Sequence, residues 1–339
     1  MTDLLASKPK KKFKVSKPFL YLLPSFILVS IFVYGFITYT VAVSLSGNWK
    51  PAKPDFTPNE RLFKVYEDLF ANARFQADIR NTMIFTLLFL AVAIIAGFFI
   101  AVMVNNMLRS KAFFRSLFLL PYALSFVVTG VVWRWIFNPD SGVNLFFQYT
   151  GVAQAYEQLT GQPLRPEWLT SPEVVGDISP LLQNIIPGGD FIQTQLGIPL
   201  ALVPVVIAAS WQLCGFAMAM FLAGLVGIPE EIHEAAMMDG ISGPRYIRSI
   251  AIPMLKPITV TTVVILLSVS FKMFDLVFVM SGTGVGFATD MPGIFVYDSM
   301  YKALAYNQGA AASVIMLFLV LVVIVPYLIS SNKQTQKED

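Results

Sequence analysis

Long apolar blocks alternate with short polar segments along this chain. A helix needs roughly 20 residues to cross the hydrocarbon core of a bilayer, which is about 30 Å thick, and several blocks reach that length. They cover residues 19–45, 82–104, 117–137, 198–226, 258–280 and 310–330. Each block is expected to be helical, because backbone polar groups cannot be left unpaired in hydrocarbon. The pattern therefore predicts an all-α integral membrane protein with six transmembrane helices.

The composition supports a membrane protein and excludes several kinds of site. Hydrophobic residues make up 56% of the chain and charged residues 13%, with a mean hydropathy of +0.66. A soluble domain usually carries about twice that charged fraction. Cys214 is the only cysteine and His233 the only histidine. An internal disulfide, a Cys- or His-based metal site and a histidine-based triad are therefore not expected, and both residues are interpreted as structural.

Basic residues orient the predicted spans through the positive-inside rule. With the N-terminus in the cytoplasm, the inner segments hold 14 Lys and Arg residues and the outer segments hold 7. The inner segments are a basic N-terminus (1–18), 105–116, 227–257 and a tail (331–339), and the outer segments are 46–78, 138–197 and 281–309. Both termini are therefore expected on the cytoplasmic side of a six-span domain that covers residues 19–330.

Two of the outer segments are long enough to have structure of their own. Residues 138–197 contain six acidic residues against Arg165 alone, and they are rich in Pro and Gly. This composition indicates an ordered extracytoplasmic loop with little regular structure. Residues 46–78 are mixed in charge, and a short helical cap is expected at residues 63–70.

The most informative polar segment, residues 227–257, lies between the fourth and fifth apolar blocks. It is expected to form a short helix, a turn and a second short helix. Pro229 suits a first helical position, and Glu230 and Glu231 complement the helix dipole at its start. Gly240 allows the left-handed conformation that ends many helices.

One face of the first short helix has the spacing of helical neighbours: Ile232, Ala235, Ala236 and Asp239. The two alanines make this face shallow, so another protein could approach it closely. Pro244 is expected to begin the second helix and Pro253 to end it. On these physical grounds alone, an amphipathic connector at the membrane interface and a docking surface are equally supported.

The same segment resembles the EAA loop of permease subunits of ABC importers. The matching positions follow the order and spacing of the family pattern: Glu234, Ala235, Ala236, Asp239, Gly240, Ile250, Pro253 and Pro257. Further stretches are similar to the carbohydrate-type permeases, namely 81–82, 115–121, 133–139, 142–144, 167–169 and 306–311. Two departures bear on specificity more than on subunit identity: the stretch 171–197 is longer than in the simplest members, and the turn 282–286 lacks the usual Gly-Gly-Pro.

The resemblance implies the type I ABC importer permease architecture in a prokaryotic cytoplasmic (inner) membrane. It also implies a second homologous permease subunit, two separate ATP-binding-cassette ATPase subunits, an extracytoplasmic solute-binding protein and a carbohydrate substrate. The chain contains no G-x-x-x-x-G-K-[ST] phosphate loop, so it is not expected to be an enzyme. ATP and Mg²⁺ would be used by the partner ATPase, and no cofactor, metal or nucleic acid is expected on this chain.

The family's coupling role carries over to the EAA loop position by position. The charged members would contact the ATPase, the small ones would pack closely against it, and the glycine would form the turn. The expected ATPase-coupling residues are Glu234, Ala235, Ala236, Asp239, Gly240, Pro253 and Pro257.

Polar groups inside spans are costly in lipid and are therefore candidates for the substrate pathway. In the fifth block they have the spacing of one helical face: Ser268, Phe271, Lys272 and Asp275. An aromatic ring beside hydrogen-bonding groups suits a sugar, but an internal ion pair between the lysine and the aspartate is an equal alternative. A second set shares a face in the fourth block, with core packing as its alternative: Trp211, Gln212 and Phe216.

Other functions stay open on different grounds. Within the importer class, a glycerol-phosphate or another polyol is the alternative substrate, although a phosphate would favour more cationic groups in the pathway than Lys272. An ion-driven secondary transporter would have no stable ATPase partner and usually more spans with paired charges. A membrane-embedded enzyme would need a catalytic set, and no pair of acids within the spans supports one.

Overall fold

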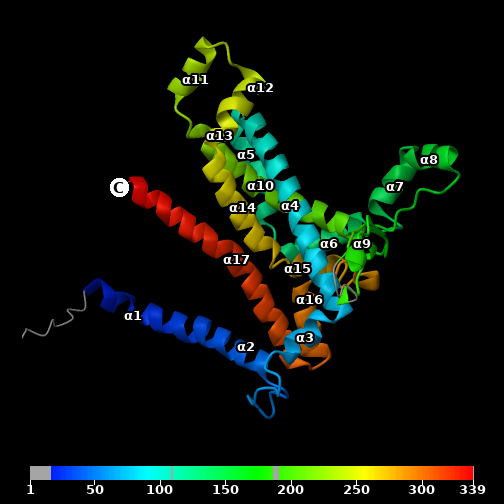
Figure 1. Cartoon of the computed structure of the whole chain (residues 1–339). Coiled ribbons are helices and arrows are strands. Elements are labelled where there is room, and N and C mark those ends of the chain that lie inside the picture. Colours follow the sequence, from blue (N-terminus) through cyan, green and yellow to red (C-terminus); the bar gives the residue numbers. More distant parts are fainter. Residues whose placement is uncertain (1–16, 108–109, 186–190, 339) are drawn as a thin grey trace, which may run out of the picture.

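The computed structural model describes residues 17–107, 110–185 and 191–338, so most of the expected basic N-terminus, together with Arg109, lies outside the described residues. The described chain is almost entirely helical (Figure 1). Its helices are α1 Lys17–Val29, α2 Phe36–Leu45, α3 Lys64–Phe70, α4 Ala73–Asn105, α5 Lys111–Leu119, α6 Phe126–Ile136, α7 Gly142–Tyr149, α8 Val152–Thr160, α9 Ser179–Ile185, α10 Leu202–Val226, α11 Glu230–Met238, α12 Gly243–Tyr246, α13 Ile252–Met254, α14 Lys256–Ser270, α15 Asp275–Met280, α16 Pro292–Tyr297 and α17 Tyr306–Glu338. The regular strands in the described part are β1 (Val174–Val175) and β2 (Ile198–Pro199), which pair antiparallel.

Four helical segments of the described chain are long and apolar enough to cross a membrane: Tyr21–Leu45, Ala73–Asn105, Leu202–Val226 and Tyr306–Ile329. Two bent pairs raise the number to six if each pair is one span: Lys111–Ala123 with Phe126–Ile136, and Gly243–Met254 with Lys256–Ser270. The first of these bends lies inside the third apolar block, and the second lies at Met254–Lys256, just before the fifth block.

The third apolar block is interrupted near Pro121. α5 ends at Leu119, a short 3₁₀ turn begins at Pro121, and α6 follows after a bend of 95°. Proline lacks an N–H and clashes with the preceding helical turn, so it opposes continuation of the helix. Ser125 then caps α6, because its hydroxyl accepts a hydrogen bond of 3.2 Å from the N–H of Val128.

The fifth apolar block is interrupted as well. α14 ends at Ser270 and α15 begins at Asp275, so residues 271–274 are not helical. The hydroxyl of Ser270 donates to the carbonyl of Leu267 (2.8 Å) and lies 3.0 Å from the hydroxyl of Thr86. A serine that bonds a nearby carbonyl competes with the helical backbone. The prediction of one continuous helical face in this block is therefore wrong. That face was expected to contain Ser268, Phe271, Lys272 and Asp275.

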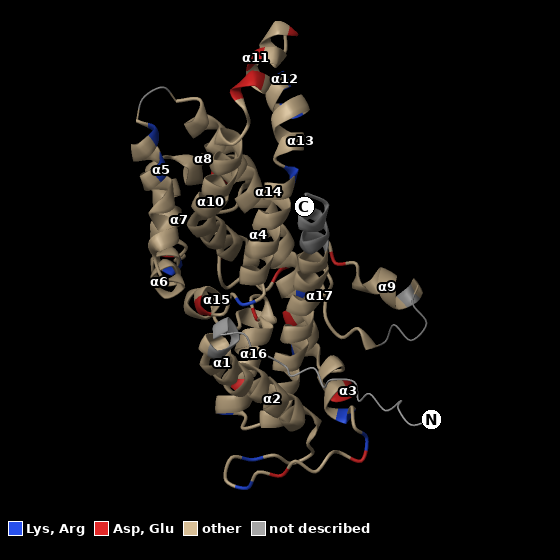
Figure 2. Ribbon diagram, turned by 90° about the vertical axis from the view of Figure 1, so that its left-hand side faces the viewer, with Lys and Arg blue, Asp and Glu red and all other residues tan. Residues whose placement is uncertain are grey.

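The centre of the molecule is the pair α4 and α10, which lie side by side in Figures 1 and 2. Phe85 and Phe89 of α4 are completely buried there, with stacked rings 5.6 Å apart. α5 joins this core at Gly215 of α10, where a Cβ would lie 2.0 Å from the carbonyl oxygen of Phe118. In lipid there is no hydrophobic driving force between helices, so they associate largely through close van der Waals packing of this kind.

The helices at the edge bury much less of their surface. Figure 1 shows α1 and α2 extending away from the α4–α10 core, with α2 packed against α17. Large side chains such as Tyr21, Ile31 and Tyr34 remain exposed. In a membrane, this apolar surface faces lipid or another protein subunit.

Polar contacts hold α4 to the segment between α15 and α17. Arg74 pairs through Nε with Asp290 (2.6 Å) and through Nη2 with Asp298 (2.7 Å). The side-chain amide of Asn81 donates to the carbonyls of Phe287 (2.8 Å) and Asp290 (2.9 Å). We call these residues the Arg74 clamp. The clamp lies near the end of the molecule that carries α3 and α16, opposite α11.

The pKa values of the two clamp carboxyls are shifted in opposite directions. Burial raises the pKa of Asp290 above its usual value, although the hydrogen bond and charge of Arg74 act in the other direction. Burial also acts to raise the pKa of Asp298, but hydrogen bonds from Lys302 and Arg74 outweigh it and hold that pKa below its usual value. Removing Arg74 would therefore leave a buried carboxyl without its cation.

Residues 138–197 contain more regular structure than their composition predicts. α7 and α8 occupy its first half, and β1 and α9 follow, with β2 directly after the segment. α8 is rich in good helix formers and is framed by Gly151 and Gly161, both in the left-handed conformation. The helical cap expected at 63–70 is confirmed by α3, which covers Lys64–Phe70.

The Arg74 clamp yields a prediction about stability. Arg74→Ala should lower the free energy of unfolding by roughly 2–3 kcal/mol, because it leaves the fully buried Asp290 unpaired. Denaturant titration in detergent micelles measures the change. Arg165→Ala is the matched control: its ion pair with Asp140 is largely exposed, so the loss should stay within about 1 kcal/mol. Equal losses in the two variants would contradict the assignment.

The contact between α5 and α10 yields a second prediction. Gly215→Ala should be strongly destabilising, by about 2 kcal/mol or more, since the new methyl overlaps the backbone at Phe118. Gly35→Ala is the control, because its nearest atom would be an ordinary 3.6 Å away. The two variants can be compared by thermal unfolding in the same detergent. A wild-type melting temperature for Gly215→Ala would show that the contact is not tight.

Candidate functional site

The EAA loop joins α10 to α14 and projects beyond the core. Figures 1 and 2 show α11 beyond the ends of α4 and α10, at the far end of the molecule from α3. α11 begins directly after Pro229, with Glu230 and Glu231 in its first turn. Pro229 is therefore the residue that caps the helix rather than its first member. The two carboxylates still lie at the positive end of the helix dipole, as predicted.

The end of α11 is fixed by a Schellman motif at Gly240. Gly240 has a φ of +72°, in the left-handed region. The N–H of Ile241 donates to the carbonyl of Ala236 (2.8 Å), and the N–H of Gly240 donates to the carbonyl of Met237 (3.0 Å). These two bonds satisfy carbonyls that the last helical turn would otherwise leave free. The turn expected at Gly240 is therefore confirmed.

The faces of α11 differ from the predicted arrangement in one respect. Glu234, Ala235 and Asp239 are exposed, and among the described residues neither acid has an ion-pair partner. Ala236 is buried, with 4% exposure, and its carbonyl accepts the hydrogen bond of the Gly240 turn from Ile241. Within this chain Ala236 therefore does not share an exposed face with Ala235, and its role in coupling stays a prediction.

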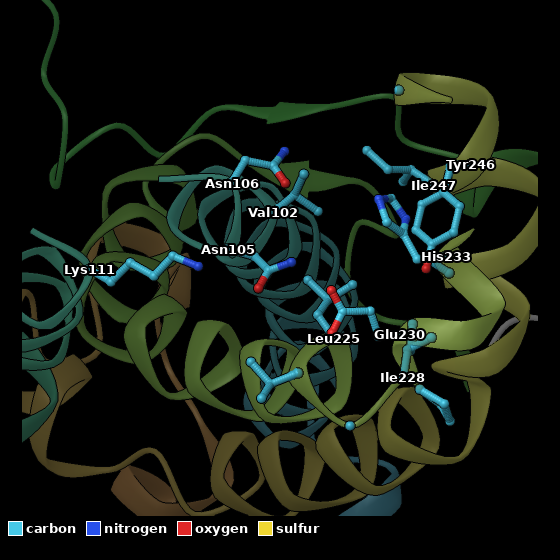
Figure 3. A pocket seen from close by; sticks show the side chains of 15 residues that line it. Val102, Asn105, Asn106, Lys111, Leu225, Ile228, Glu230, His233, Tyr246 and Ile247 are labelled. Carbon is cyan, nitrogen blue, oxygen red and sulfur yellow. The ribbon is translucent and has the colours of Figure 1, made fainter. Parts of the chain in front are cut away.

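A hollow of about 760 Å³ lies under the loop. Figure 3 shows Asn105, Asn106 and Lys111 on one side of it, with His233 and Tyr246 on the other. The rings of His233 and Tyr246 meet edge to face at 4.8 Å and join α11 to α12. The sole histidine therefore makes a ring contact within the loop, and its structural role stays a prediction.

The second half of the loop leads into the fifth span through a sharp bend. The second helix runs from Gly243 through a π-helical stretch at Ile247–Ala251 to Met254, so it ends one residue after Pro253, close to the predicted end. Pro253 follows that π-helical stretch directly, at a place where the regular α-helical hydrogen-bond ladder is already interrupted. The chain bends by 68° between Met254 and Lys256, and Pro257 lies in the first turn of α14. Both prolines therefore flank the bend.

The candidate pathway residues of α10 face the broken third span. Gln212 is buried and donates through Nε2 to the carbonyl of Leu124 (2.7 Å), within the break between α5 and α6. Phe216 stacks on Tyr122 of the same break, with ring centroids 5.6 Å apart. These contacts favour packing as the role of Gln212 and Phe216. Trp211 is 39% exposed and is the member of the set that a solute could reach most easily.

The candidate residues of the fifth block are separated by the break. Ser268 donates its hydroxyl to the carbonyl of Val264 within α14, so it is engaged locally. Lys272 and Asp275 are both exposed, and no ion pair joins them in the described structure. The alternative of an internal Lys272–Asp275 pair is therefore wrong within this chain. Phe271, directly after α14, is partly buried.

Sequence reasoning overlooked two kinds of residue. Met237 and Met238 are exposed at the tip of the loop, at 52% and 88%, although methionine is usually buried. Their position directly before Asp239, at the end of the predicted helix, was the sequence signal that could have indicated their exposure. The Arg74 clamp was overlooked because its partners lie more than 200 positions apart in the chain. A single sequence offers no signal for such pairs.

Comparisons with known proteins agree on one family for this chain. Residues 93–333 match the family described as binding-protein-dependent transport system inner membrane component. A probable ABC transporter permease of Pyrococcus horikoshii is 30% identical, covering 94% of this chain and 96% of its own length. The xylose/arabinose import permease protein XacH of Haloferax volcanii is 29% identical over 91% of this chain and 86% of its own.

A solved structure agrees at the level of the fold. The crystal structure of a bacterial ABC transporter involved in the import of the acidic polysaccharide alginate contains a similar chain, with a TM-score of 0.69 and 18% identity. The similarity covers 93% of this chain and 95% of that one. This chain therefore belongs to the family of binding-protein-dependent transport system inner membrane components, and it is a multi-pass permease subunit of an ABC importer.

Proposed function

We propose that this permease imports a carbohydrate and is driven by ATP hydrolysis that reaches it through α11. A permease of this family has no ATPase activity of its own, so the energy must come from other subunits. The proposed assembly contains a second homologous permease, two ATPase subunits and an extracytoplasmic solute-binding protein. Both termini and α11 would lie in the cytoplasm, in keeping with the distribution of Lys and Arg.

The shape of the EAA loop is the observation that carries the coupling proposal. α11 stands clear of the core and offers Glu234, Asp239 and Met238 on an exposed surface. Exposed apolar side chains beside charges are typical of a docking surface. Met238 would fill an apolar groove of the ATPase, and the two acids would meet cations on its rim. The Schellman turn would hold these groups in place during docking.

The rest of the loop offers a route from the docking surface to the membrane. The ring contact between His233 and Tyr246 joins α11 to the second half of the loop. That half runs through the 68° bend into α14. Movement of α11 with the ATPase would therefore pull on the fifth span, whose break at 271–274 lies at the other end of α14. Helix ends and breaks are where rigid segments change direction most easily.

The proposed carbohydrate pathway runs along the breaks in the third and fifth spans. Charged side chains without partners are costly in lipid, so Lys272 and Asp275 must face water, substrate or the second permease. Trp211 and Phe271 would stack on the apolar face of a sugar ring. Support comes from relatives: XacH is a xylose/arabinose permease, and the 26% identical protein MalF of Thermococcus litoralis belongs to a trehalose/maltose system.

A glycerol-phosphate is the second candidate substrate. The sn-glycerol-3-phosphate permease UgpA of Rhizobium meliloti is 26% identical over 76% of this chain. Lys272 would be the cation that recognises the phosphate. The carbohydrate is preferred because the exposed Asp275 lies three residues from Lys272 and would repel a phosphate.

Charge reversal on α11 tests the coupling. In the assembled importer, Glu234→Lys should lower the ATPase stimulation caused by the loaded solute-binding protein by about tenfold or more, because it places like charges together at the docking surface. Binding of the solute to its binding protein should not change. Glu67→Lys makes the same change on an exposed residue of α3, at the opposite end, and should leave stimulation intact. Full stimulation in Glu234→Lys would rule out this role.

Two substitutions at the fifth-span break distinguish the substrates. If a neutral sugar is carried, Lys272→Met and Phe271→Ala should each slow its uptake about tenfold. The reason is that each substitution removes roughly one charged hydrogen bond or one ring contact to the sugar. If a glycerol-phosphate is carried, Lys272→Met should cost about a hundredfold or more, and Phe271→Ala little. Uptake of labelled solutes into cells measures both. Lys64→Met on α3 is the control, and unchanged uptake in both break variants would remove the site.

A further inference from the structure

An apolar groove lies on the surface of the spans, beside the bend that joins the EAA loop to α14. It has a volume of about 330 Å³ and is bounded by α4, α10, α13 and α14. The lining residues are Ile94, Ile95, Phe98, Phe99, Phe221, Ile252, Leu255 and Thr259. The hollow under the loop is a separate feature, lined by polar and apolar residues at the ends of the helices.

The floor and the rim of the groove differ in exposure. Phe221 and Leu255 form a floor that is almost completely buried, each with 2% exposure. Ile95, Phe99 and Ile252 on the rim are 56%, 61% and 48% exposed. The groove is therefore open to whatever surrounds the spans, and it offers that medium an apolar channel.

The lining offers no free hydrogen-bonding group to a polar occupant. Thr259 is its polar member, and its hydroxyl donates to the carbonyl of Leu255 (3.0 Å), inside the helix. Phe98 and Phe221 meet edge to face at 5.5 Å and close the side of the channel. Water gains nothing from such a surface, whereas a hydrocarbon chain gains contact along its whole length.

Cations stand where the chain leaves the groove for the EAA loop. Arg248 precedes Ile252 by four residues, and Lys256 follows it by four. Both are exposed, and neither takes part in an ion pair among the described residues. Figure 2 shows basic segments along the stretch from α12 to the start of α14, and acidic segments on α11.

The depth of the groove matches the boundary between headgroups and acyl chains. Phe98 lies seven residues before the end of α4 at Asn105, which is about 10 Å along a helix. If Asn105 marks the level of the headgroups, the aromatic wall of the channel lies inside the hydrocarbon, and Arg248 and Lys256 would lie at its headgroup end. Lys and Arg near the surface of a membrane attract anionic lipids.

We propose that this groove binds an anionic phospholipid, with an acyl chain in the channel and the phosphate between Arg248 and Lys256. Leu255, at the 68° bend, forms part of the floor. A bound lipid would therefore stiffen the joint through which α11 moves the fifth span. The site does not depend on which solute the importer carries, so it can be tested without a known substrate.

Native mass spectrometry of the assembled importer tests the site with two defined probes. Phosphatidylglycerol should remain bound more tightly than phosphatidylcholine with the same chains, by about 30-fold, or about fivefold for each cation. Arg248→Gln combined with Lys256→Gln should reduce the preference to near unity. Lys111→Gln, which removes an exposed cation outside the groove, should preserve it. Equal binding of the two lipids by the wild type would overturn the proposal, as would a preference that survives the double substitution.

A second measurement starts from the wild-type complex, so its main result does not depend on the folding of a variant. Phosphatidylglycerol with a photoreactive group in its acyl chain should label peptides that contain Phe98, Phe99 or Ile252. Ile95→Trp, which fills the channel, should reduce that labelling at least about fivefold. Labelling confined to other spans would refute the site. Cross-links from the second permease to these same residues would assign the groove to a protein partner instead.

Discussion

Hydrocarbon offers no hydrogen-bond partners, and this chain breaks two of its apolar blocks inside that medium. Each break frees backbone groups that must be satisfied by other parts of the protein. Gln212 does this for the third block, because its amide reaches the carbonyl of Leu124 from the neighbouring α10. The hydroxyl pair of Thr86 and Ser270 joins α4 to the end of α14 at the fifth block. The two central helices therefore act as the scaffold on which both broken segments depend.

The same constraint explains why small residues and polar residues occur together along the core. Gly215 lets α5 approach α10 so closely that a methyl group would overlap its backbone. At the other end, the Arg74 clamp supplies donors to carbonyls and carboxyls in the irregular segment between α15 and α17. Close packing at one end and the ion pairs and hydrogen bonds of the Arg74 clamp at the other thus fix the core. The segments that can move are those outside this frame.

The EAA loop is the clearest of these segments. It is internally rigid, because the Schellman turn, the buried Ala236 and the contact between His233 and Tyr246 hold its two halves together. Its connection to the core is a sharp bend with proline on either side. A rigid body on a bent joint suits the transfer of motion from a partner. The lipid groove proposed at that joint would make the transfer sensitive to the composition of the membrane.

The sequence alone determined the membrane environment, the course of most spans and the position of the EAA loop. Those features follow from long apolar runs, helix-ending residues and a local motif, and each is encoded by neighbours in the chain. Local signals also predicted the turn at Gly240, since a left-handed residue is required within a single helix end.

The tertiary structure decided what depends on distant partners. It broke the face expected from Ser268 to Asp275, placed Ala236 inside the loop, and gave Gln212 a carbonyl to satisfy. It also assembled the Arg74 clamp from residues more than 200 positions apart. Helical periodicity assumes an unbroken helix and ignores what packs against it. Contacts between separate segments settle both points, and a pattern read along one chain does not contain them.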